Sequence, residues 1–146
     1  VRKRLVRMPK LHFYDSGLAC WLLGIRNAEQ LRLHPLRGAI FESWVVSEIV
    51  KQRANRGESG GVCFYRDRHG LECDLLIEHG GQLTIVEAKA GQTANSDLFD
   101  SARRVRDVLA TTGPTRATVM YAGAAAQTRG DIRLVPWEGV GEEEWA

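Results

Sequence analysis

The 146-residue sequence lacks the features of a secreted or membrane-spanning protein. No apolar run approaches the roughly 20 residues that a membrane-spanning helix needs. No stretch resembles a signal peptide, with its charged start, apolar middle and small-residue cleavage site. The three cysteines form no CxxC pair, and their odd number argues against a disulfide framework. These absences favour a location in the reducing cytoplasm.

The sequence also lacks a charge excess of either sign, because its net charge at pH 7 is only +2. The basic residues are unevenly distributed, since the start, VRKRLVRMPK, carries five of them and no acid, whereas the end, WEGVGEEEWA, is acidic. A basic segment can neutralise phosphates. A solvated helix face or a linker is the more frequent origin of such a segment. Charge alone therefore does not predict a nucleic-acid partner.

The hydrophobic pattern predicts three helices and five strands. We expect helices over residues 17–25, 36–53 and 97–109, and strands over residues 62–66, 71–78, 82–90, 117–123 and 131–137. Apolar side chains recur at spacings of three and four in the second and third helices, and turn-like sequences separate the strands. Trp21 and Trp44 are expected in the core. This order of elements is typical of α/β or α+β proteins.

Charged residues interrupt the predicted strands at 71–78 and 82–90. Pairing the two strands shows which of these residues lie opposite one another. A two-residue hairpin turn at Gly80-Gly81 would place His79 opposite Gln82. The same register would place Asp74 opposite Glu87 and Glu72 opposite Lys89. Side chains alternate between the faces of a strand. One face is then almost wholly apolar, with Leu71, Cys73, Leu75, Ile77, Thr84, Val86, Ala88 and Ala90. The other carries Glu72, Asp74, Leu76, Glu78, Leu83, Ile85, Glu87 and Lys89.

The charged cluster on that second face admits two interpretations. Carboxylates directly opposite each other on antiparallel strands repel one another, so a positive group between Asp74 and Glu87 is expected. Lys89 could supply it, and so could a divalent metal such as Mg²⁺, which takes oxygen ligands. The alternative is a salt-bridged surface with Glu72–Lys89 and Asp74–Lys89 contacts. The spacing leaves both open.

Asp74 on one strand and Glu87-Ala88-Lys89 on the next, after the helix sequence GAIFESWVVSE, resemble the PD-(D/E)XK nuclease-like superfamily. No proline precedes Asp74, which departs from the superfamily motif. The resemblance implies an α/β, restriction-endonuclease-like fold. In that fold an αβββαβ core has a central mixed sheet flanked by helices, here with an N-terminal helical extension.

A narrower resemblance covers residues 9–110 in four ordered blocks: PKLHFYDSGLACWLLGI, GAIFESWVVSEIVKQ, FYRDRHGLECDLLIE and IVEAKAG. Together they resemble the domain of unknown function found after the AAA-type module of prokaryotic (archaeal-type) ATPases. The resemblance implies an upstream P-loop ATPase domain. The sequence has no GxxxxGK[ST] motif, so ATP would bind only in that missing domain. We expect a basic, helical N-terminal extension over 1–35, the PD-(D/E)XK-like domain over 36–137 and an acidic tail over 138–146.

The superfamily resemblance also implies roles for individual residues. Asp74 and Glu87 would bind Mg²⁺ or Mn²⁺, together with the backbone carbonyl of Ala88 and water. Lys89 would orient or help to deprotonate the attacking water, or pair with the phosphate. An acid on the preceding helix would complete the site: Glu42 is the first candidate and Glu48 the alternative.

Arg66 and Arg68 are possible phosphate contacts, although a solvated turn is the more frequent setting for such residues. Two functions follow from the resemblance. One is metal-dependent hydrolysis of DNA phosphodiesters, as an endo- or exodeoxyribonuclease attached to an AAA-type ATPase. The other is a catalytically inactive nuclease-fold module for DNA or protein docking and regulation of that ATPase. The sequence leaves open whether the domain is an enzyme.

Overall fold

The structure, a computed structural model, describes residues 9–145. Four of the five basic residues of the N-terminal segment, Arg2, Lys3, Arg4 and Arg7, therefore lie outside the described residues, and Lys10 lies inside them. Within residues 9–145 no helix is both long enough and apolar enough to cross a membrane.

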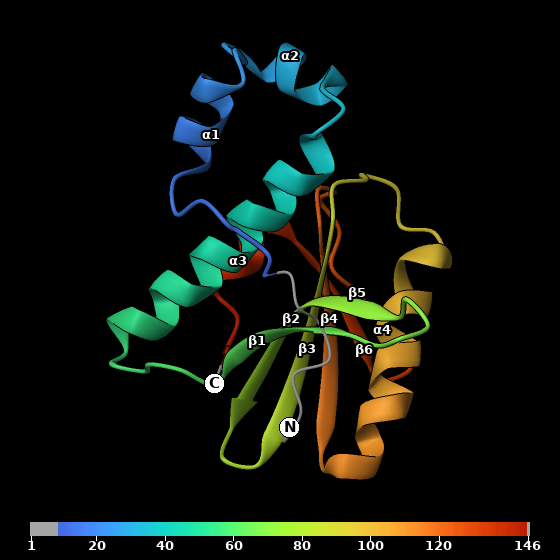
Figure 1. The fold of residues 1–146 in the computed structure, drawn as a ribbon. Helices are drawn as coiled ribbons and strands as arrows, with labels where there is room; N and C mark the ends of the chain where they lie inside the picture. The colour runs from blue at the N-terminus through green and yellow to red at the C-terminus, as the bar shows by residue number, and fades with distance from the viewer. Residues whose placement is uncertain (1–8, 146) are drawn as a thin grey trace.

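A six-stranded mixed sheet forms the centre of the molecule, as the α/β prediction requires (Figure 1). Its strands are β1 (Val62–Arg66), β2 (Glu72–His79), β3 (Gln82–Lys89), β4 (Thr115–Tyr121), β5 (Gln127–Arg129) and β6 (Ile132–Pro136). Their order across the sheet is β1-β2-β3-β4-β6-β5. The first three strands form antiparallel pairs, and β4 is parallel to β3 and to β6. The short strand β5 pairs antiparallel with β6.

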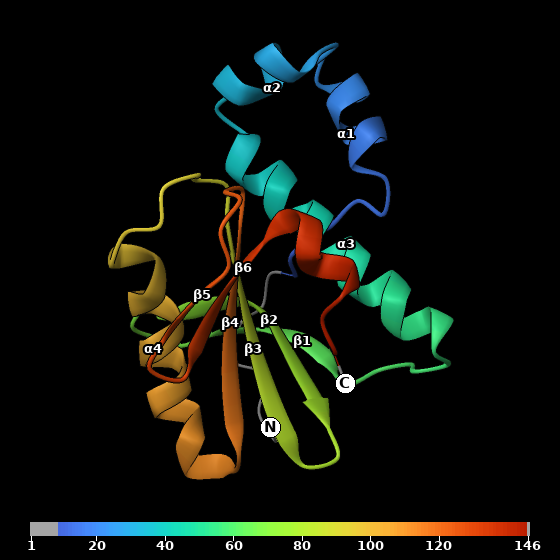
Figure 2. The same cartoon turned by 180° about the vertical axis from the view of Figure 1, so that it is seen from behind.

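Two long helices cover opposite faces of the sheet, as the two views of Figures 1 and 2 show. The first, α3 (Arg37–Asn55), lies over a core that includes Leu75, Val86 and Met120. The second, α4 (Asp97–Leu109), lies over a core that includes Ile85 and Val119. Both predicted helices are confirmed. The sheet thus buries both of its faces, and the face predicted to be charged also contributes to a core.

The β2–β3 hairpin has the predicted register over most of its length. His79 pairs with Gln82, and the following pairs continue to Leu75 opposite Val86. Gly80 and Gly81 have φ angles of 57° and 82°, the left-handed conformation that a two-residue turn of this kind needs. The glycine pair therefore fixed the alignment of the two strands.

A β-bulge in β2 overturns part of the predicted face assignment. Cys63 lies opposite Leu76, but Tyr65 lies opposite Cys73, so β2 has one more residue than β1 between these pairs. A bulge redirects the side chains that follow it. Cys73 accordingly packs in the α4 core, whereas Leu75 packs in the α3 core. The prediction that both residues share one face was wrong, and Asp74 lies within the bulged stretch.

Two short elements were not predicted. Helix α2 (Ala28–Leu33) lies between the first two predicted helices, and the side chain of Asn27 caps it by accepting a hydrogen bond from the Gln30 N–H. Strand β5 lies between the last two predicted strands. Both are too short to produce a visible hydrophobic period. Each depends on neighbouring elements that the sequence pattern does not locate.

The short N-terminal helices lie beyond one end of the sheet, next to the start of α3 (Figure 1). Asp15 caps α1 (Ser16–Leu22), because its carboxylate accepts from the Leu18 N–H at 3.0 Å. Trp21 on this helix is 60% exposed, so the prediction that it is a core residue was wrong. Trp44 packs against the α3 core and makes an edge contact with Trp137.

The segment predicted as an acidic tail folds back against the sheet and α3. A 3-10 helix, η2 (Trp137–Gly141), contacts α3, and Trp145 is buried to 1% exposure. Arg53 of α3 donates to the backbone oxygen of Trp145, and Arg133 pairs with Glu143. The described part of this segment therefore closes the α3 core.

Candidate functional site

The predicted acids lie where β2 and β3 stop pairing regularly. The regular pairing ends at Leu75 opposite Val86, so it does not extend to Asp74 and Glu87. Instead, Oδ2 of Asp74 accepts a hydrogen bond from the backbone N–H of Ala88 at 2.9 Å. The Asp74 side chain thus satisfies a donor of β3 next to the bulge. This bond holds the Asp74 carboxylate beside Glu87 and Lys89, the two neighbours of Ala88 in the chain.

The other oxygen of Asp74 belongs to a three-residue ion cluster. Lys10 Nζ lies 3.0 Å from Asp74 Oδ1 and 2.8 Å from Glu42 Oε1. The three side chains are 22%, 12% and 23% exposed, respectively, for Lys10, Asp74 and Glu42. Burial lowers the pKa of Lys10, but the hydrogen bond to Glu42 and the charge of Asp74 outweigh it and raise the pKa above its usual value. Lys10 therefore keeps its positive charge between the strand acid, Asp74, and the helix acid, Glu42.

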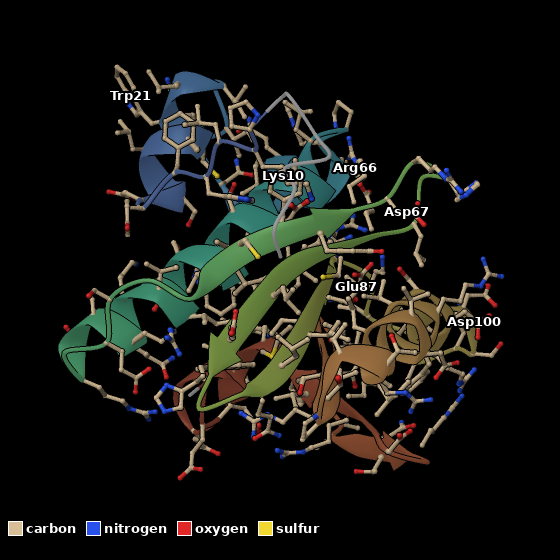
Figure 3. All side chains as sticks on the ribbon, turned by 60° about the horizontal axis from the view of Figure 1, so that its bottom comes forward. Lys10, Trp21, Arg66, Asp67, Glu87 and Asp100 are labelled. Atoms are coloured by element: carbon tan, nitrogen blue, oxygen red, sulfur yellow. The ribbon has the colours of Figure 1, made fainter. Side chains whose placement is uncertain are left out.

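Glu87 is the most deeply buried acid of the site. Its side chain is 4% exposed, and Oε1 accepts from Lys89 Nζ at 2.6 Å. Among residues 9–145, Oε2 of Glu87 has no hydrogen-bond partner. Burial raises the pKa of Glu87 and the charge of Asp74 raises it further, against the opposing effects of Lys89 and of the nearby Ser101 hydroxyl. Figure 3 shows Glu87 in the region between the sheet and α4, with Lys10 on the side of α3.

The two helix acids differ in position. Glu42 joins Asp74 through Lys10, whereas Glu48 lies further along α3 and pairs with Lys51 at 2.5 Å. Glu48 and Lys51 are 30% and 43% exposed. The structure therefore brings together Asp74, Glu87, Lys89 and Glu42, and leaves Glu48 apart.

The ion pairs predicted for a salt-bridged surface, Glu72–Lys89 and Asp74–Lys89, were wrong. Lys89 contacts Glu87 rather than Glu72 or Asp74. Glu72 is paired with Arg66, whose Nε lies 2.6 Å from Glu72 Oε2. The Glu72–Arg66 pair follows from their positions opposite each other on β2 and β1. Arg68 is exposed in the turn after β1, and its Nε donates to His69 at 3.0 Å.

A hollow of about 510 Å³ lies between the β1–β2 turn and the start of α4. Asp67 and Asp100 line it from the turn and the helix, and both are labelled in Figure 3. Its other charged lining residues are Glu72, Asp97, His69 and Arg104. Acids predominate, so the hollow favours cations over phosphates.

The donor set of the site fits a hydrated divalent cation rather than a fully enclosed one. Within residues 9–145, no three side chains of His, Cys, Asp or Glu converge on a point where they could hold a metal ion. Mg²⁺, however, commonly keeps several waters and uses only one or two carboxylates. Asp74 and Glu87 supply two, and the buried Oε2 of Glu87 accepts no hydrogen bond from the described residues. Glu42 is already neutralised by Lys10.

Lys10 is the site residue that the sequence did not reveal. It lies 32 positions before Glu42 and 64 before Asp74, and it belongs to a basic segment that resembles a solvated surface. A lysine side chain is long and adapts to many settings, so its type predicts no partner. Its presence in the first of the four ordered blocks was the only available signal.

Comparison with known proteins places most of the chain in one family model. The model, described as "Domain of unknown function (DUF4143)", matches residues 37–140. Two uncharacterized proteins, from Mycobacterium bovis and Mycobacterium tuberculosis, are each 28% identical over 123 residues. The match covers 84% of this chain and 26% of each relative. The chain thus spans about a quarter of the length of the curated relatives that it matches.

Proposed function

The chain belongs to the DUF4143 family of domains of unknown function, and from this premise we propose that it is a metal-dependent nuclease domain that acts on DNA. One observation carries the proposal. Glu87 is buried beside Asp74 and Lys89, and its Oε2 lacks a partner within the described part of the chain. Lys89 pairs with only one oxygen of this carboxylate, and burying the other costs stability unless a further cation completes the site.

The arrangement of elements supports a restriction-endonuclease-like core. The chain order α3, β1, β2, β3, α4, β4 follows an αβββαβ pattern around a mixed sheet. Asp74 and Glu87 lie just beyond the regularly paired part of β2 and β3. Glu42 approaches Asp74 from α3 through Lys10.

In this proposal, Asp74 and Glu87 hold Mg²⁺ or Mn²⁺, with the backbone carbonyl of Ala88 as a further donor. The bound ion would lower the pKa of a water molecule and stabilise negative charge on the phosphate. Lys89 Nζ, 2.6 Å from Glu87 Oε1, orients that water or pairs with the phosphate. Glu42 would complete the outer shell of the site, and in the absence of metal it shares Lys10 with Asp74.

The proposed substrate is double-stranded or branched DNA, and the proposed location is the cytoplasm. Arg66 and Arg68 flank the turn beside the site and would contact phosphates. Arg66 would first have to leave Glu72. The resemblance of the four sequence blocks makes an upstream AAA-type ATPase domain the proposed partner in the full-length protein, and the relatives are long enough to contain such a domain.

A second candidate function is a catalytically inactive docking module that regulates the ATPase. The observation that favours it is the position of Lys10, whose ammonium group already pairs with both Glu42 and Asp74 without any metal. In this case the ion cluster would be a structural link between the N-terminal segment, α3 and β2.

Cleavage of supercoiled plasmid and of branched DNA in the presence of Mn²⁺ distinguishes these functions. We expect metal-dependent cleavage, reduced at least about a hundredfold in Asp74→Ala and Lys89→Ala. Lys51→Ala, which removes a lysine of a carboxylate pair outside the site, is the matched control and should cleave like wild type. Full cleavage by Asp74→Ala would mean that the activity comes from another site or a contaminant. No cleavage by wild type would favour the docking module.

A further inference from the structure

We infer that Lys10 sets the metal affinity of the site by competing with the divalent cation for the carboxylates of Asp74 and Glu42. The inference rests on the proposed function, because it assumes that Asp74 is a metal ligand. It assigns a role to a residue outside the proposed metal and catalytic set. Lys10 is a positioning residue here, since it acts through Asp74.

The oxygens of Asp74 explain why competition is expected. Oδ2 accepts from the Ala88 N–H, and Oδ1 accepts from Lys10 Nζ. A metal that approaches Asp74 must therefore share Oδ1 with an ammonium group or displace it. The ammonium and the cation would lie on one carboxylate group, and like charges at such separations repel strongly in a partly buried site.

The site has a second carboxylate oxygen that is already free of this competition. Glu87 Oε2 is buried and lacks a partner among the described residues, and Lys10 does not contact Glu87. A cation can therefore begin to bind at Glu87. It reaches Asp74 only when the ammonium group of Lys10 moves away.

Lys10 is able to move because little else holds its ammonium group. Its side chain is 22% exposed, and besides the two acids it contacts the Phe64 ring, 5.9 Å from Nζ to the ring centroid. His12, two residues later, lies against Ser43 of α3. Burial lowers the pKa of His12, so this histidine adds no firmly held positive charge to the site near neutral pH.

Without the charge of Lys10, Glu42 and Asp74 should form a cation site that no ammonium group of the protein fills. The two acids then repel each other until a cation binds. The domain should lose stability without metal and regain it when metal is added. If Lys10 only stabilises the structure, removing its charge should disorder the site and weaken metal binding instead.

The test is a titration of the purified domain with Mn²⁺ alone, with free Mn²⁺ measured by electron paramagnetic resonance. Lys10→Met should bind Mn²⁺ at least about tenfold more tightly than wild type. Lys10→Arg, which keeps the charge, should retain the wild-type affinity. Thermal unfolding should show a larger Mn²⁺-induced rise in Tm for Lys10→Met than for wild type. Lys10→Gln, which can still donate to one acid, carries the test if Lys10→Met does not fold.

Lys51→Met is the matched control, because it removes a lysine that pairs with Glu48 on the same helix. Its Mn²⁺ affinity should equal that of wild type. Wild-type binding without a gain in Lys10→Met and Lys10→Gln overturns the role of Lys10 and leaves the proposed metal site intact. No Mn²⁺ binding by wild type and both Lys10 variants overturns the proposed function together with this inference.

Discussion

Lys10 and Asp74, 64 positions apart in the chain, form an ion pair with 3.0 Å between Nζ and Oδ1. The pair joins the segment before α1 to the bulged part of β2, and Glu42 connects it to α3. Partly buried charge networks of this kind occur at functional sites. The ion pair also separates the two candidate functions. The nuclease requires a metal ion at Asp74, whereas in the docking module Lys10 remains paired with Asp74.

The choice between the helix acids can be tested by two alanine variants. We expect Glu42→Ala to reduce Mn²⁺-dependent cleavage about 10- to 100-fold, because it removes the helix acid that would complete the outer shell of the metal site. Glu48→Ala should have no effect on cleavage, since Glu48 pairs only with the exposed Lys51 among the contacts described for α3. A loss of cleavage in Glu48→Ala with full activity in Glu42→Ala would reverse the assignment.

Glu87 should make the stability of the domain depend on pH. Its pKa is raised in the folded state, chiefly by burial and then by Asp74. The stability it contributes is therefore full below the ordinary glutamate value and is lost as the pH rises through the raised value. Glu87→Gln, which stays neutral, should be about 1 kcal/mol more stable than wild type at pH 7. The difference should shrink towards about pH 4.

Urea unfolding of Glu87→Gln and wild type at both pH values measures this difference, in metal-free buffer. Lys89 loses its carboxylate partner in the variant, but it is 34% exposed and can be solvated. Equal stability at pH 7, or a less stable variant, would show that the charge of Glu87 is already well compensated.

The buried Arg53 should stabilise the domain through two contacts, one with the C-terminal segment and one with Glu58. Its guanidinium lies 2.6 Å from the Trp145 oxygen and 2.8 Å from Glu58 Oε2. Arg53→Met leaves a poorly exposed carboxylate without its partner and should reduce the free energy of unfolding by about 3 kcal/mol. Lys51→Met, on the exposed side of the same helix, should change it by less than about 0.5 kcal/mol. Denaturant unfolding compares the two, and similar losses would contradict the assignment.

Two neighbouring glycines offer a matched pair at the start of β1. Both Gly60 and Gly61 have positive φ, but only at Gly61 would a Cβ meet the backbone, 2.5 Å from the Glu78 oxygen. Gly60→Ala should cost about 1 kcal/mol for the left-handed conformation. Gly61→Ala should cost about 3 kcal/mol, because β1 must also move away from β2. Equal costs in thermal or urea unfolding would show that β1 adapts freely.

The sequence predicted the parts of this fold that depend on local chemistry. The Gly80-Gly81 turn determined the β2–β3 register, and regular hydrophobic spacing located α3 and α4. The bulge next to Asp74 was not predictable, since it depends on how β1 aligns with β2. For the same reason, the predicted faces failed at Cys73, on the far side of the bulge from the turn.

The candidate site was predictable in its strand residues and not in its charge balance. Asp74, Glu87 and Lys89 follow from strand alternation and from the resemblance to a nuclease motif. The partner of each charge depends on tertiary contacts: Lys10 arrives from a segment that no pattern links to β2. Trp21 shows the same limit, because an apolar side chain on a short helix does not reveal whether another element covers it.

The most direct test of the proposed function is a crystal of the domain soaked in Mn²⁺, examined for anomalous density. We expect one Mn²⁺ ion bound by Asp74 and Glu87, with Lys10 Nζ moved away from Asp74 Oδ1. The contradicting result is an absence of density at these carboxylates, with Lys10 still paired to Asp74 and Glu42. That outcome would leave the domain with an internal ion cluster and no metal site.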